Sequence, residues 1–61
     1  MSYESYNFTS FGDATKELKE LYSQGYHLVA ATTPFAVTKR TDDGEHIYLY
    51  AIEYFLERPK Q

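Results

Sequence analysis

Cysteine is absent from this chain, and its absence removes devices that often stabilise small proteins. Without cysteine there is no disulfide and no thiolate zinc site, and His27 and His46 are too few for a site made of histidine alone. We therefore expect no metal and no cofactor. The 61 residues predict one domain, residues 1–61, and a chain of this size buries only about 60% of its unfolded surface. Self-association is the remaining source of stability.

Basic charge and long apolar runs are also scarce. The formal net charge is −3, whereas binding along a nucleic-acid backbone requires a basic surface. No apolar run approaches the roughly 18 residues that cross a bilayer. Residues 1–4 have neither the basic nor the apolar part of a signal peptide. We expect neither a membrane nor a long nucleic acid among the partners, and a cytoplasmic location.

Aromatic residues and β-forming residues are plentiful by contrast. The chain has seven tyrosines and four phenylalanines. The alternation in residues 3–11 predicts a first strand. Residues 14–24 have apolar side chains at helical spacing and predict an amphipathic helix. Asp13 precedes it as a candidate capping residue, and Gly25 follows where a helix commonly ends.

The rest of the chain predicts a β-hairpin after one more strand segment. Residues 26–33 and 35–40 are strand-like and are separated by Pro34, which marks a bulge, an edge position or a strand end. Residues 41–44, Thr-Asp-Asp-Gly, predict a hairpin turn. The last strand, residues 45–57, is long enough to pair with both preceding segments. The predicted fold class is α+β, in the order β-α-β-β, with an antiparallel sheet and one helix on one face.

Short motifs lie on these predicted strands: Tyr3-Glu4-x-Tyr6, Gly25-Tyr26-His27-Leu28-Val29-Ala30, Tyr48-x-Tyr50 and Phe55-x-x-Arg58-Pro59. Together with the element order, they resemble a widespread family of uncharacterised small βαββ domains of bacteria, archaea and phages. That family usually has Gly-Trp-Glu-Leu-Val where this chain has Gly-Tyr-His-Leu-Val at residues 25–29. The resemblance implies the fold and a bacterial or phage-infected cell. It implies no activity, because the function of the family is unsettled.

The last strand is apolar on both sides, although one short helix can cover only one face. With a four-residue loop at 41–44, the facing pairs are Arg40 with Glu45, Lys39 with His46, Val37 with Tyr48, and Phe35 with Tyr50. We expect the helix to cover the aliphatic side, which carries Ile47, Leu49 and Ala51. The tyrosine side then has no partner within the chain, and an apolar patch of that kind usually marks an interface. We expect a second copy to cover it about a two-fold axis, so that the protein is at least a dimer.

The candidate ligand-binding residues are the rings of this side and the cations near them: Phe35, Lys39, Arg40, His46, Tyr48, Tyr50, Tyr54 and Arg58. Tyrosine rings stack on bases and other flat groups. An arginine fork and a lysine charge both suit phosphate. This combination favours a small nucleotide-like anion. The alternative is that the rings only pack and that the cations line a solvated strand end.

Nothing in the sequence indicates catalysis, because it has no cysteine nucleophile, no Gly-x-Ser-x-Gly motif and no phosphate-binding glycine loop. We expect no catalytic residue and no enzyme. The first hypothesis is a small homo-oligomeric binding protein with a pocket between subunits. By analogy with phage proteins of similar design, it would sequester a nucleotide or cyclic-nucleotide immune signal. The alternatives are a protein–protein inhibitor of a host defence enzyme, such as an anti-CRISPR-type protein, and a purely structural accessory domain.

Overall fold

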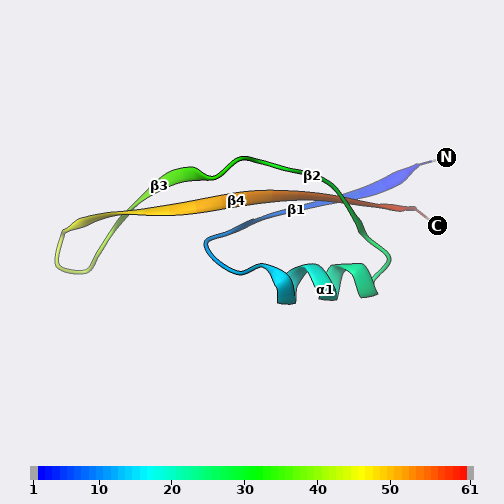
Figure 1. Ribbon diagram of the computed structural model, residues 1–61, viewed down its shortest axis with the longest axis horizontal. Coiled ribbons are helices and arrows are strands. Elements are labelled where there is room, and N and C mark those ends of the chain that lie inside the picture. Colours follow the sequence, from blue (N-terminus) through cyan, green and yellow to red (C-terminus); the bar gives the residue numbers. More distant parts are fainter. Residues whose placement is uncertain (1, 61) are drawn as a thin grey trace.

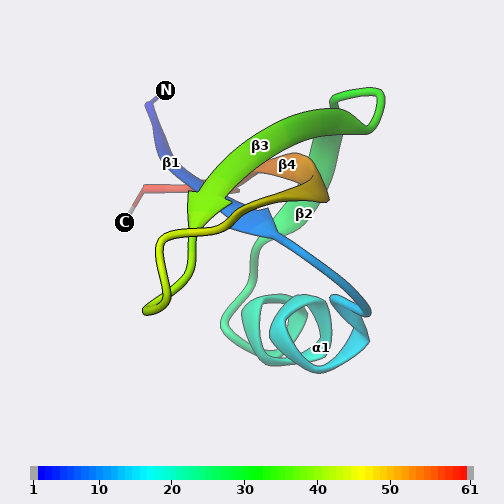
Figure 2. The same cartoon turned by 90° about the vertical axis from the view of Figure 1, so that its left-hand side faces the viewer.

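The computed structural model describes residues 2–60 as an antiparallel four-stranded sheet with one helix on one side (Figure 1 and Figure 2). The elements are β1 (Tyr3–Ser10), α1 (Thr15–Ser23), β2 (His27–Ala31), β3 (Phe35–Arg40) and β4 (His46–Pro59). The α+β class is confirmed. The segment that Pro34 interrupts forms two separate strands, β2 and β3, so the observed order is β-α-β-β-β instead of the predicted β-α-β-β. Residues 1 and 61, which complete the predicted domain, lie outside the described residues. Within residues 2–60, no helix is long and apolar enough to span a membrane.

Local capping interactions set the two ends of α1, close to the predicted positions. At the start, the Asp13 carboxylate accepts a hydrogen bond from the Thr15 N–H at 3.0 Å, which satisfies one of the free donors of the first turn. At the end, Gly25 has a φ of 93°, in the left-handed region that favours glycine. Its N–H donates to the Tyr22 carbonyl at 3.1 Å and closes the last turn.

The central element is β4, a strand of 14 residues that pairs differently in its two halves. Its C-terminal half pairs with β1, from Ser10 opposite Ile52 to Tyr3 opposite Pro59, and with β2 along the other edge. Its N-terminal half pairs with β3. The fold therefore has a three-stranded body and a two-stranded hairpin, residues 35–51, that extends past the helix (Figure 1).

An irregular stretch separates β2 from β3. The register of β2 shifts between Leu28 and Ala30, so the bulge lies at Val29 rather than at Pro34. Beyond β2, Thr32 still pairs with β4, because its N–H donates to the Glu53 carbonyl and its hydroxyl accepts the Glu53 N–H, both at 3.0 Å. Pro34 then lies in the break before β3, as the sequence predicted for a strand end.

The connection between β3 and β4, residues 41–45, is one residue longer than predicted, and this changes the register. The Gly44 N–H donates to the Thr41 carbonyl at 3.0 Å, and the Thr41 N–H donates to the Glu45 carbonyl at 2.8 Å. Gly44 has a φ of 87°, the conformation of a bulge glycine after a tight turn. As a result, Arg40 faces His46 instead of Glu45. A slip of one residue exchanges the faces of a strand, so the predicted pairs of this hairpin are wrong.

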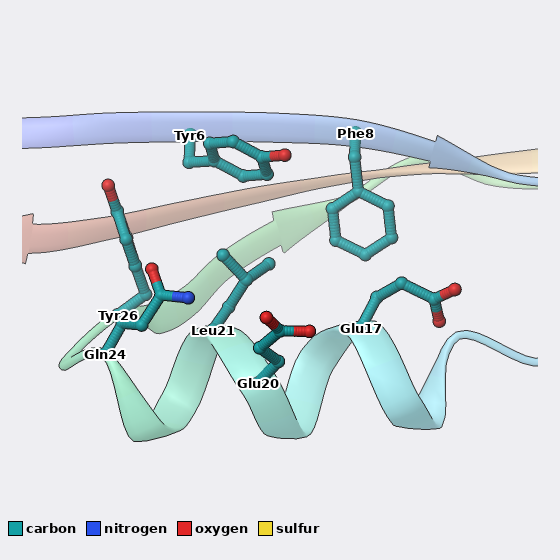
Figure 3. Close-up of a pocket in the computed structure, with 7 residues that line it drawn as sticks. All are labelled: Tyr6, Phe8, Glu17, Glu20, Leu21, Gln24 and Tyr26. Carbon is teal, nitrogen blue, oxygen red and sulfur yellow. The ribbon is translucent and has the colours of Figure 1, made fainter.

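The helix covers the tyrosine side of β4, not the aliphatic side. Leu21 of α1 points toward Tyr6 and Phe8 of β1 (Figure 3), and Tyr6 lies opposite Leu56 of β4. The prediction that α1 covers Ile47, Leu49 and Ala51 is therefore wrong. The reason is connectivity, since α1 joins β1 to β2 and both strands pair with the C-terminal half of β4. The helix is held over that half of the sheet and does not reach the hairpin.

The hydrophobic core is small, and the molecule is elongated. The buried apolar residues of the described part are Ala14, Leu21, Ala51 and Leu56. The radius of gyration is 14.7 Å, whereas a compact chain of this length has about 10.5 Å. The accessible surface is 4873 Å², compared with about 4,100 Å² for a compact monomer of this mass. The hairpin has only two strands and no helix over it, and its Tyr48 and Tyr50 are the most exposed aromatic side chains of the described residues.

Candidate functional site

One face of the hairpin carries the most exposed aromatic side chains of the described residues. Tyr48 and Tyr50 are 71% and 70% exposed. The register places Thr38 opposite Tyr48, Ala36 opposite Tyr50, and Arg40 opposite His46. We call this set the tyrosine face: Ala36, Thr38, Arg40, His46, Tyr48 and Tyr50. It continues the side of β4 that α1 covers further along, but it lies beyond the end of the helix (Figure 1).

The chemistry of the tyrosine face changes along the hairpin. Near the turn it has a cationic guanidinium beside an imidazole, Arg40 with His46. Toward the body it has two phenol rings in succession on one strand. Directly opposed side chains of antiparallel strands lie about 4.5–5.5 Å apart at Cβ, so ring and cation are within reach of one small molecule. This face can stack on a flat group and bind an anionic group at Arg40.

The other face of the hairpin holds two of the predicted site residues. Its facing pairs are Phe35 with Ala51, Val37 with Leu49, and Lys39 with Ile47. Phe35 and Lys39 are therefore separated from the tyrosines, contrary to the prediction that grouped them. This face is aliphatic and less exposed, with Ala51 buried and Leu49 partly buried. Phe35 and Ile47 on this face are each 38% exposed, about half as much as Tyr48 and Tyr50.

The remaining predicted site residues, Tyr54 and Arg58, lie in the body of the fold. Tyr54 stacks on Phe8 with ring centroids 5.3 Å apart. The Arg58 guanidinium donates to the Glu4 carboxylate at 2.9 Å and to the Gln24 carbonyl at 2.7 Å. Arg58 therefore has partners in its own chain and ties the end of α1 to the sheet. Four of the eight predicted residues, Arg40, His46, Tyr48 and Tyr50, come together in one place.

A groove between α1 and the sheet was not predicted from the sequence. It has a volume of about 330 Å³ and is lined by Tyr6, Phe8, Glu17, Glu20, Leu21, Gln24 and Tyr26 (Figure 3). Glu17, Glu20 and Gln24 recur at helical spacing beside Leu21, which is the sequence signal that could have indicated a polar wall. The charged groups of this lining are the Glu17 and Glu20 carboxylates. Such a groove repels anions, whereas the tyrosine face carries the Arg40 guanidinium.

The turn at the end of the hairpin adds local negative charge. The Thr41 hydroxyl donates a hydrogen bond to the Asp43 carboxylate. This bond, together with a backbone N–H from Glu45, lowers the pKa of Asp43 below its ordinary value of 3.8. Asp43 is therefore ionised at neutral pH and stabilises the turn that holds Arg40 opposite His46.

Comparisons of the chain with protein-family models, with curated proteins and with solved structures give no match. The resemblance to small βαββ domains therefore stays a prediction.

Proposed function

We propose that this protein is a small, non-enzymatic binding protein that self-associates through its hairpin and holds a nucleotide-like anion on the tyrosine face. The observation that carries the proposal is the exposure of Tyr48 and Tyr50, 71% and 70%, on a ribbon of two strands. A two-stranded hairpin without further cover is at best marginally stable in water. A partner that covers this hairpin both stabilises it and completes a site around the rings.

The surface area of the chain supports self-association. The accessible surface of 4873 Å² exceeds that of a compact monomer by about 800 Å². A stable protein interface of ordinary size buries about 800 Å² on each partner. The core of the chain is too small to compensate, since its largest fully buried side chain is Leu56. A second copy of the chain, with the same exposed hairpin, can supply the partner surface.

The character of the tyrosine face supports the ligand class. Base stacking on an aromatic side chain contributes about 1–3 kcal/mol, and it tolerates different bases. Arginine binds phosphate through paired N–H donors. Arg40 and the two tyrosines share this face, whereas the groove beside α1 offers only carboxylates as charged groups. A mononucleotide or cyclic nucleotide combines the flat group and the anion that this face accommodates.

The mass of the protein in solution tests the assembly. We expect light scattering on a sizing column to give at least twice the monomer mass of 7.1 kDa. Tyr50→Ala should shift the mass toward the monomer, because it removes exposed apolar area from the hairpin. Tyr22→Ala is the matched control, since Tyr22 is an exposed tyrosine on α1, and it should leave the mass unchanged. A parent protein that is monomeric at 100 µM contradicts the proposal and favours docking onto a different protein.

Thermal stability against a panel of nucleotides tests the ligand. A ligand at 100 times its Kd stabilises a protein by about 2.7 kcal/mol, which gives a clear rise in Tm. We expect AMP, GMP, cAMP, cGMP or a cyclic dinucleotide to give such a rise. Arg40→Ala should abolish it and spare assembly. Lys39→Ala, which removes a neighbouring cation from the opposite face, should keep it. An unchanged Tm with every nucleotide contradicts the ligand class.

A further inference from the structure

We propose that the second copy adds to the open edge of β4 in an antiparallel arrangement centred on Tyr48, so that two hairpins join into one four-stranded sheet, β3-β4-β4-β3. This inference rests on the proposed self-association and names its geometry. Its basis is the direction of the backbone groups along the N-terminal half of β4, residues 46–51. Those groups can be assigned from hydrogen bonds on either side of the strand.

The even-numbered residues of β4 direct their N–H and C=O groups toward β1. This follows from the Lys60 N–H, which donates to the Ser2 carbonyl at 2.9 Å on that edge. Odd-numbered residues point the other way, as Glu53 exchanges hydrogen bonds with Thr32 and the Glu45 carbonyl accepts from Thr41. The two directions alternate along an antiparallel strand.

The β1 edge of β4 is open along the hairpin. β1 ends at Ser10, opposite Ile52, and within residues 2–60 no other strand pairs with this edge. His46, Tyr48 and Tyr50 therefore direct three N–H and three C=O groups toward an unoccupied edge. Unpaired groups of this kind form a template for another strand.

This edge has none of the features by which proteins usually prevent strand pairing. Residues 46–51, His-Ile-Tyr-Leu-Tyr-Ala, include no lysine, arginine, acidic residue or proline. The outer edge of β3 differs, because it follows Pro34 and ends in Lys39 and Arg40. Lysine and proline on an edge strand discourage pairing. The sequence thus protects one edge of the hairpin and leaves the other available.

One register uses all of the free backbone groups. If Tyr48 lies opposite Tyr48 of the second copy, then His46 lies opposite its Tyr50, and Tyr50 opposite its His46. These three pairs each exchange two hydrogen bonds. A shift of two residues toward the body would place His46 opposite Ile52, whose backbone groups face β1. Only the register centred on Tyr48 leaves none of these free groups unpaired.

This arrangement completes the tyrosine face with residues of the second copy. The four tyrosines of the two copies lie together at the joint, on one side of the sheet. His46 of each Arg40–His46 pair then lies opposite Tyr50 of the other copy, so that a phenol ring stands beside the imidazole and the guanidinium. The ligand site would therefore be formed by both subunits, with two equivalent halves related by the two-fold axis. A nucleotide-like anion would bind only to the assembled form.

Single-cysteine variants test this geometry, because the parent chain has no cysteine. Hydrogen-bonded antiparallel pairs have Cα atoms about 5.5 Å apart, within the range of a disulfide. We expect Tyr48→Cys to form a disulfide-linked dimer in mild oxidant. Thr38→Cys is the matched control: it lies opposite Tyr48 on the same face, but on the outer strand. It should cross-link at least about tenfold more slowly, since the two copies of β3 are separated by both β4 strands.

The outcomes distinguish this inference from the proposed function. Rapid cross-linking of Tyr48→Cys but not Thr38→Cys supports the geometry. A dimeric mass with no cross-linking of Tyr48→Cys overturns the edge pairing and leaves self-association standing. A monomeric parent protein overturns both. Because the cysteine side chain can weaken packing, Tyr48→Lys serves as a second variant. It places two ammonium groups opposite each other across the axis and should give a folded monomer by circular dichroism and mass, whereas Thr38→Lys should remain a dimer.

Discussion

The guanidinium carbon of Arg58 lies over the Tyr26 ring, 4.4 Å from its centroid. Tyr26 follows Gly25, between the end of α1 and the start of β2. The same guanidinium bonds to Glu4 on β1 and to the carbonyl of Gln24. One side chain of β4 thereby joins the first strand, the central strand and the end of the helix. This contact explains how a helix with so little buried apolar surface stays fixed to the sheet.

Replacing Arg58 should loosen the helix from the sheet. Arg58→Ala removes a partly exposed ion pair, a carbonyl hydrogen bond and a cation–π contact, which together contribute about 1–2 kcal/mol. We expect urea titration to show that loss in the free energy of unfolding. Arg58→Lys should recover only part of it, because an ammonium cannot form the same paired hydrogen bonds. Lys16→Ala, on the exposed side of α1, should change stability by less than about 0.5 kcal/mol, and an equal loss there would contradict this role for Arg58.

Leu56 should be the most sensitive position of the core. It is 1% exposed, whereas its cross-strand neighbour Leu28 is 40% exposed. Leu56→Ala should cost about 2–4 kcal/mol through lost burial and the cavity left behind. That is a large part of the total stability of so small a domain, about 3–5 kcal/mol. Thermal melts followed by circular dichroism should show Leu56→Ala largely unfolded and Leu28→Ala folded. Similar effects of the two variants would mean that the core lies elsewhere.

Gly44 should be required for the hairpin turn. Its φ of 87° is costly for any residue with a Cβ, by about 1–2 kcal/mol. Gly44→Ala should therefore destabilise the hairpin and weaken self-association, both measurable by urea titration and by the mass in solution. Gly12→Ala is the control, because Gly12 has no positive φ and open space where the new Cβ would lie. Equal stability of the two variants would contradict the turn geometry and the register that depends on it.

Acid should destabilise the hairpin through Asp43. Hydrogen bonds from Thr41 and from the backbone hold the pKa of the Asp43 carboxyl below its ordinary value of 3.8. A lowered pKa in the folded state means that the ionised form stabilises the fold above the unfolded pKa. This contribution is lost as the pH falls through the folded pKa, below about 3.8. Asp43→Asn should therefore flatten the dependence of Tm on pH between about 5 and 2.5. A parent protein and variant with parallel curves would show that this carboxylate does not stabilise the turn.

The elements of this fold could be predicted where short-range interactions decide them. Asp13 and Gly25 bound the helix because each acts within a few residues of its own position. The alternation in β1 and the long apolar run of β4 indicated strands for the same reason. The candidate site was only partly predictable. Arg40, His46, Tyr48 and Tyr50 do share a face. Phe35 and Lys39 lie on the other face, because the connection between β3 and β4 is one residue longer than predicted.

By itself, the sequence determined the order of the strands and the helix, the absence of disulfides, and an excess of aromatic side chains over what one helix can cover. Tertiary structure alone decided which side of β4 the helix covers and which end of that strand stays open. The physical reason is that α1 is held by its connections to β1 and β2, both of which pair with one half of β4. Nothing in residues 46–51 themselves indicates where β1 ends. The edge of β4 is open along these residues only because β1 ends at Ser10.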